Sequence, residues 1–104
     1  MKDRVSKWLS TESVTLETTL PDNMDYDTVK QDEVLSRLLL KDDDTFMPDL
    51  IDLDTISRAA ASMTYEDCSV IVFKDGGIRI TKISHSALTE LLLRREEWLE
   101  KNAA

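Results

Sequence analysis

Cys68 and His85 are the only cysteine and the only histidine in the chain, and together they could form a nucleophile and its base. A hairpin that places Cys68 opposite Ile83 would bring His85 diagonally across on the same face. No third residue is indicated that could orient the imidazole, and a single cysteine in a strand is usually a small buried hydrophobe. The sequence therefore predicts no catalytic residues and a protein that is not an enzyme.

Metal ions and cofactors are not expected either. One cysteine and one histidine cannot complete a structural zinc site. The aspartates at 22–27, 42–44 and 49–54 offer many oxygens, but they lack the EF-hand spacing, which needs a glycine at the sixth loop position. The only two glycines, Gly76 and Gly77, are adjacent in a turn, so they cannot form a phosphate-binding loop.

The distribution of charge carries most of the functional information. The 104 residues have a net charge of −8, and residues 11–54 alone carry thirteen acids against three bases. Such a segment repels nucleic acid, whose binding depends on Lys and Arg, and attracts a basic protein surface. The alternative is that this charge only keeps the protein soluble. The predicted partner-binding residues are Asp22, Asp25, Asp27, Asp42, Asp43, Asp44, Asp49, Asp52 and Asp54.

These residues must be positioned by a fold, and the clearest element in it is a β-hairpin over residues 68–83. Both halves are rich in β-branched and aromatic residues, and Asp75-Gly76 between them suits a type I′ turn. Because the first strand of the hairpin is apolar on both faces, we expect both of its faces to be covered.

The hairpin register follows from the loop length. A two-residue loop at Asp75-Gly76 pairs Phe73 with Ile78 and Ile71 with Ile80, which gathers apolar side chains on one face. A three-residue loop would instead set Phe73 against Arg79 and Ile71 against Thr81. We prefer the first register, in which Arg79 and Thr81 point outward.

The remaining elements are predicted mainly as helices. In residues 25–41 the apolar stripe is Val34, Leu35, Leu38 and Leu39, and in residues 49–62 it is Leu50, Leu53, Ile56 and Ala60. A last helix, capped by Ser84 or Ser86, runs to about residue 102 with Leu88, Leu91, Leu92, Arg95 and Leu99 on its inner side. Its other expected contacts are a Glu90–Arg94 ion pair and an Arg94–Trp98 stack.

The expected fold class is α+β, with a single domain over residues 1–104. A small antiparallel sheet, made of the hairpin 68–83 and possibly a third strand at 13–19, packs against about four helices. The first helix lies within residues 2–10, so the order of elements is α-β-α-α-β-β-α.

The most plausible function from sequence is a small acidic interaction module that docks on a basic surface of a partner protein. It would act as an inhibitor or regulator of a nucleic-acid-handling system, in the manner of phage or mobile-element accessory proteins. The alternative is a homo-oligomeric assembly subunit, with a possible homodimer built by the last helix or by the hairpin edge. No membrane segment is expected, and the single cysteine suits the cytoplasm of a bacterium or of an infected host cell.

Overall fold

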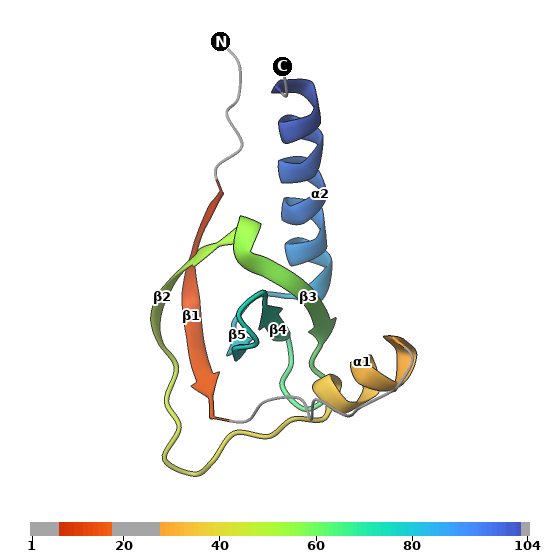
Figure 1. Cartoon of the computed structure of the whole chain (residues 1–104). Helices are drawn as coiled ribbons and strands as arrows, with labels where there is room; N and C mark the ends of the chain where they lie inside the picture. Colours follow the sequence, from red (N-terminus) through yellow and green to blue (C-terminus); the bar gives the residue numbers. More distant parts are fainter. Residues whose placement is uncertain (1–6, 18–27, 103–104) are drawn as a thin grey trace.

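The computed structural model describes residues 7–17 and 28–102, with only the backbone described for residues 28–31. Its centre is a five-stranded antiparallel sheet in the order β2-β1-β5-β4-β3 (Figure 1). The strands are β1 (Trp8–Leu16), β2 (Met47–Asp52), β3 (Ile56–Ala61), β4 (Ser69–Phe73) and β5 (Ile78–Thr81). A short helix, α1 (Thr28–Ser36), and a long one, α2 (His85–Asn102), complete the fold together with a single 3-10 turn, η1 (Leu53–Thr55).

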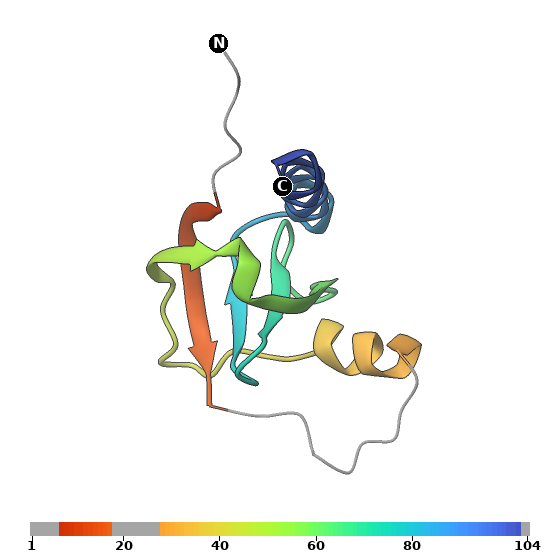
Figure 2. The ribbon, with the colours of Figure 1, turned by 45° about the horizontal axis from the view of Figure 1, so that its top comes forward.

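The sheet is strongly curled, and the connection between its edges requires this. Strands β2 and β3 lie at opposite edges, yet η1 alone joins them. Five strands side by side in a flat sheet would separate these edges by about 19 Å. The four steps from Asp52 to Ile56 span at most about 14 Å when fully extended, and less in a 3-10 turn. The sheet therefore bends into a partly closed barrel (Figure 2).

Both faces of the sheet are covered, which explains why every residue of β4 is buried. On one face, Leu35 of α1 joins Val70, Val72, Ile78 and Ile80 in a buried cluster. On the other face, the buried residues are Ile51, Leu53, Ile71, Phe73 and Leu88 of α2. The expectation that the first hairpin strand is covered on both sides is confirmed.

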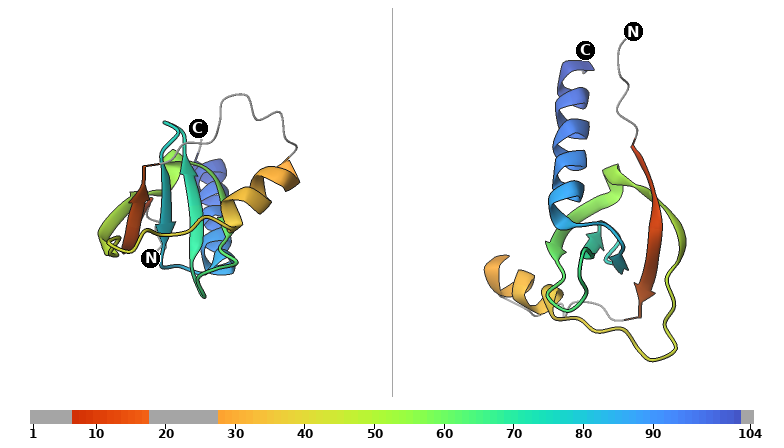
Figure 3. Two further views of the ribbon diagram at one scale, coloured as in Figure 1. Left: turned by 90° about the horizontal axis from the view of Figure 1, so that it is seen from below. Right: turned by 180° about the vertical axis from the view of Figure 1, so that it is seen from behind.

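Helix α2 begins as the sequence predicts and packs on the sheet through its first half. The Ala87 amide donates to Ser84 Oγ at 3.2 Å, which identifies Ser84 as the N-cap. Leu88 is fully buried and Leu91 and Leu92 are partly buried, whereas Leu99 is 41% exposed. The second half of α2 extends beyond the sheet, as Figure 1 and the right view of Figure 3 show.

The predicted arrangement of a small sheet against about four helices is wrong. Residues 49–62, predicted as a helix, form the end of β2, η1 and β3. Ile51 lies off the expected helical stripe yet is only 1% exposed, whereas Leu50 on that stripe is 58% exposed. The β-branched residues of this segment and its pairing with two distant strands outweigh a helix-like spacing of apolar residues.

The other boundaries also change. The predicted third strand exists but is longer, since β1 starts at Trp8, where the first helix was expected. Residues 2–6 of that predicted helix lie outside the described chain. The helix predicted over residues 25–41 ends at Ser36 as α1, and Leu39 of its expected core stripe is 65% exposed; residues 25–27 lie outside the described chain. The structure is thus sheet-dominated α+β, with the hairpin strands β4 and β5 inside the sheet and not at its edge.

The hairpin itself is confirmed, but its register differs by one residue from the preferred prediction. Val72 pairs with Ile78 and Ile71 with Arg79. The loop has three residues, 74–76, closed by a 2.8 Å hydrogen bond from the Phe73 amide to the Gly77 carbonyl. It lies one position earlier than the three-residue loop considered above, so the pairing of Phe73 with Arg79 is also wrong. Gly76 supplies the left-handed conformation this loop requires, with φ +92°. Because of the shift, the Thr81 side chain is not outward but fully buried.

Candidate functional site

The nine aspartates predicted to bind a partner fall into three groups. Asp22, Asp25 and Asp27 lie outside the described residues. Asp49, Asp52 and Asp54 lie on β2 and η1, and we call them the β2 acids. Asp42, Asp43 and Asp44 lie in the connection between α1 and β2, and we call them the loop acids. The β2 acids and the loop acids have very different surroundings.

Asp49 is paired with a cation of β5, which is separated from β2 by β1. Its carboxylate accepts hydrogen bonds from Arg79 Nη1 at 3.0 and 3.2 Å. The same guanidinium lies 4.5 Å from the centre of the Phe73 ring. The contact with the Phe73 ring is a cation–π interaction, which helps to hold the guanidinium in place for its bonds to Asp49. Asp49 thus closes a structural contact across the sheet.

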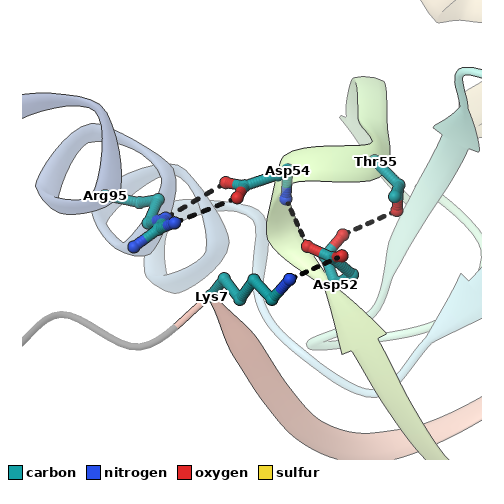
Figure 4. Close-up of polar contacts among 5 residues, drawn as sticks. All are labelled: Lys7, Asp52, Asp54, Thr55 and Arg95. Atoms are coloured by element: carbon teal, nitrogen blue, oxygen red, sulfur yellow. Dashed lines mark hydrogen bonds and ion pairs between the residues drawn. The ribbon is translucent and has the colours of Figure 1, made fainter. Parts of the chain in front are cut away.

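Asp52 and Asp54 tie the β1 start, η1 and α2 together (Figure 4). The Asp52 carboxylate accepts from the Asp54 amide at 3.0 Å and lies 3.6 Å from Lys7 Nζ. Asp54 receives two hydrogen bonds from Arg95, at 3.0 and 3.1 Å. These bonds hold the pKa of the Asp54 carboxyl below its usual value, although partial burial acts in the opposite direction.

The loop acids have no cation of this kind. The Lys41 amide donates to Asp44 Oδ2 at 2.7 Å, and the Asp44 amide donates to the Lys41 carbonyl at 3.0 Å. These two bonds close a tight turn. Asp42 and Asp43 stand exposed at its tip, and neither forms an ion pair within the described part of the chain.

A groove of about 410 Å³ lies beside this turn, between the end of β1 and the segment that follows α1. Leu16 and Leu38 pack against the core cluster beneath it, and Leu39 exposes 65% of its surface. Among the described residues that line it, the one cation is Lys41, whose Nζ lies 3.4 Å from Glu17 Oε2 in a pair whose side chains are both largely exposed. The groove is lined by Thr15, Leu16, Glu17, Leu38, Leu39, Lys41, Asp43 and Asp44.

The wall of the groove is held in place by contacts to the far side of the sheet. The Leu40 amide donates to the Tyr65 hydroxyl at 2.9 Å, and the Met63 amide donates to the Ser36 carbonyl at 2.9 Å. Arg58 of β3 forms an ion pair with Asp32 of α1. The irregular segment after α1 is therefore anchored at both sides, so the groove is a formed feature.

The surface as a whole keeps an acidic excess after internal pairing. Seven ion pairs join described residues, and each uses one acid and one base. Among the described side chains this leaves ten acids but only three bases outside these pairs. The acids are Glu33, Asp42, Asp43, Asp44, Glu66, Asp67, Asp75, Glu96, Glu97 and Glu100. Of this set, Asp43 and Asp44 line the groove beside the turn, and Asp42 is next to them in sequence.

Catalytic and metal chemistry find little basis in the described geometry. Burial raises the pKa of the Cys68 thiol, which disfavours the thiolate that a nucleophile requires. The observed register also differs by one residue from the alignment that would set Cys68 opposite Ile83; Ser69 Oγ donates to the Ile83 carbonyl instead, at 2.7 Å. Across residues 7–17 and 28–102, no three His, Cys, Asp or Glu side chains converge to hold a metal ion.

Sequence reasoning found the loop acids but not the groove. The signal was a run of three leucines, separated by Lys41 from three aspartates, and this pattern is typical of the end of an amphipathic helix. Because the chain leaves the helix after Ser36, this run becomes an extended wall with one leucine turned outward. The Glu90–Arg94 ion pair is present at 2.6 Å, whereas the ring of Trp98 lies under Arg95 and not under the predicted Arg94.

No family model, no curated protein and no solved structure matches this chain. The description as an inhibitor, a regulator or a phage-type accessory protein therefore has no support from relatives, and we do not retain it. No helix within the described ranges is both long and apolar enough to cross a membrane.

Proposed function

We propose that this protein is a non-catalytic protein-binding domain whose groove between β1 and the loop acids accepts a basic, partly apolar segment of a partner protein. The observation that carries the proposal is the exposed Leu39 in a groove bordered by carboxylates. An apolar floor and an acidic rim together select a segment in which an aliphatic side chain lies beside Lys or Arg.

The apolar part of the groove supplies binding free energy. Leu39 is 65% exposed, and covering it removes apolar surface from water. Full burial of a leucine side chain is worth about 1.5–3 kcal/mol, so covering the exposed part of Leu39 contributes a substantial share of that. Leu16 and Leu38 beneath it are already packed against the core, so they present a firm surface to the ligand.

The acidic part supplies selectivity and fast association. Asp42 and Asp43 form no ion pair with a described residue that would compete with a ligand, and the Lys41–Glu17 pair is exposed enough to be exchanged readily. A Lys or Arg of the partner can therefore approach either side of the groove. This arrangement repels nucleic acid, and it makes binding of a basic protein fall as salt rises.

The test is fluorescence anisotropy with a labelled peptide of alternating Lys and Leu, measured at low and at high salt. The double variant Asp42→Asn/Asp43→Asn should weaken binding by about tenfold at low salt, if each carboxylate contributes a typical 0.2–1 kcal/mol. Leu39→Ala should weaken binding at both salt concentrations, because the contact it removes is apolar.

The matched control is Glu96→Gln/Glu97→Gln, which removes the same charge from exposed positions on α2. This control should leave binding nearly unchanged. Equal weakening by both double variants would show that only net charge matters, and the groove would then have no specific role. Binding that ignores salt would also contradict the proposal.

A further inference from the structure

Strand β2 is an open edge of the sheet. It pairs with β1, and no other described strand lies beside it, as its outermost position in Figures 1 and 3 shows. The opposite edge, β3, is covered by both helices. An edge strand presents unpaired backbone donors and acceptors, and a protein either blocks them or uses them to pair with another strand.

The ladder shows which backbone groups of β2 point outward. The Leu53 amide donates to the carbonyl of Lys7, directly opposite in the β1–β2 register, at 2.7 Å. In an antiparallel pair the hydrogen-bonded residues alternate along the strand. Met47, Asp49 and Ile51 therefore bond to β1, whereas Pro48, Leu50 and Asp52 direct their backbone groups to the open edge.

The second side of β1 confirms this alternation. The Lys82 amide donates to the Glu12 carbonyl at 2.9 Å, so the even-numbered residues of β1 bond to β5. The backbone groups of the odd-numbered β1 residues therefore bond to β2. The two ladders agree on the direction of every backbone group in β2.

The outward groups of β2 are complementary to themselves. Pro48 has no amide hydrogen, so it offers only a carbonyl. The Asp52 carbonyl already accepts the Thr55 hydroxyl at 2.6 Å, so Asp52 offers its amide (Figure 4). Leu50 offers both groups. When two such strands run antiparallel with their Leu50 residues opposite each other, Pro48 of one copy faces Asp52 of the other. The missing amide hydrogen of Pro48 then lies opposite the Asp52 carbonyl, which already accepts a hydrogen bond from Thr55.

We propose that two copies of this chain associate through β2, about a two-fold axis at Leu50, to form a continuous ten-stranded sheet. The two Leu50 residues exchange two hydrogen bonds, and each Asp52 amide donates to the Pro48 carbonyl of the other copy. A two-fold interface requires this kind of self-complementarity. The site lies apart from the groove proposed above, so either proposal can fail without the other.

Side chains and charges favour the same pairing. Leu50 and Trp8 lie on one face of the sheet and are 58% and 49% exposed, so the dimer extends one apolar strip across the axis. The carboxylates of Asp49 and Asp52 are paired with Arg79 and Lys7, which limits repulsion between the two acidic strands. A strand pair of this length buries a small area, so a dimer with rapid exchange is expected.

Pro48 would ordinarily protect an edge from pairing. Here it disfavours one alternative register. Shifting the strands so that Pro48 faces Leu50 would leave the Leu50 carbonyl without a donor, and it would set the two Asp49 residues directly opposite each other. The proline therefore acts against this alignment and still permits the proposed one.

Cross-linking through introduced cysteines tests the register. In Leu50→Cys the two thiols meet at the axis, where opposed Cα atoms lie about 5.5 Å apart. Met47→Cys is the control, because Met47 is equally exposed on the same strand but lies opposite Leu53 of the other copy. A short bis-maleimide should cross-link Leu50→Cys to dimer and leave Met47→Cys monomeric. Equal cross-linking, or none in Leu50→Cys, would overturn the proposal.

Light scattering from low micromolar to millimolar protein provides a second measurement. The unmodified chain should show a mass that rises toward that of a dimer. Leu50→Pro should remain monomeric, because it removes the outward donor and leaves the β1–β2 ladder intact. Leu50→Ala keeps that donor and should still dimerise, although less strongly. A rising mass in Leu50→Pro equal to that of the unmodified chain would rule out the β2 interface.

Discussion

The β2 acids and the loop acids are neighbours in sequence and identical in side-chain type, yet they have opposite roles in the molecule. Each β2 acid has a cation of its own, supplied by β5, by the start of β1 or by α2. Within the described residues the loop acids form no ion pair; Asp44 accepts a hydrogen bond from a backbone amide, and Asp42 and Asp43 are exposed. A cluster of aspartates is therefore a candidate binding surface only after internal partners have been counted.

The contrast extends to the apolar residues beside each group. Ile51 lies among the β2 acids and is buried, whereas Leu39 lies beside the loop acids and is mostly exposed. The β2 segment is needed for the fold to close, because it and η1 join the two edges of the sheet. The loop segment is anchored to the fold but keeps its polar and apolar surface available.

The largest expected effect is on stability, through the core of the β2 segment. Ile51→Ala should lower the free energy of unfolding by about 2–5 kcal/mol, because it opens a cavity in the cluster that includes Leu53 and Phe73. Leu50→Ala at the preceding position should change the free energy of unfolding by less than about 0.5 kcal/mol. Urea denaturation measures both. Similar losses in the two variants would contradict the assigned strand faces.

A smaller effect should separate the two acidic groups directly. Asp52→Ala removes the side chain that accepts the Asp54 amide at the start of η1 and should cost about 1 kcal/mol of unfolding free energy. Asp43→Ala removes an exposed carboxylate without an internal partner, and its effect should lie within about 0.5 kcal/mol. Thermal or urea unfolding of the two variants side by side provides the measurement. A destabilising Asp43→Ala would show that the loop acids also support the fold.

The smallest effect concerns acid sensitivity. The pKa of Asp54 is lowered in the folded state, chiefly by its hydrogen bonds to Arg95, so the unfolded chain binds its proton first as pH falls. The stability that Asp54 contributes is fully present above its unfolded value of about 3.9 and is lost as pH falls through the lower folded value.

The stability difference between the native chain and Asp54→Asn should therefore be constant near neutral pH and shrink in strong acid. Denaturant titrations at a series of pH values test this, and Asp43→Asn serves as the control with no such trend. If the stability difference between the native chain and Asp54→Asn instead grew toward low pH, the pKa of Asp54 could not be lowered in the folded state.

The sequence by itself determined the elements whose signals are local. Asp75 and the two glycines define a turn, and the dense β-branched residues on either side define β4 and β5. Ser84 and the leucine spacing after it define the start and inner face of α2. The acidic bias is likewise a property of composition. For these features, short-range propensity and the final fold point the same way.

Only the tertiary structure decided the rest, because the remaining signals depend on distant partners. The apolar spacing of residues 49–62 is compatible with a helix, and pairing with β1 and β4 makes it two strands. The register of the hairpin depends on which three residues form the loop, and it places the Thr81 hydroxyl 2.9 Å from that of Ser13 on β1. Which aspartates remain free depends on where Lys7, Arg79 and Arg95 arrive in space, and residue types alone do not specify that.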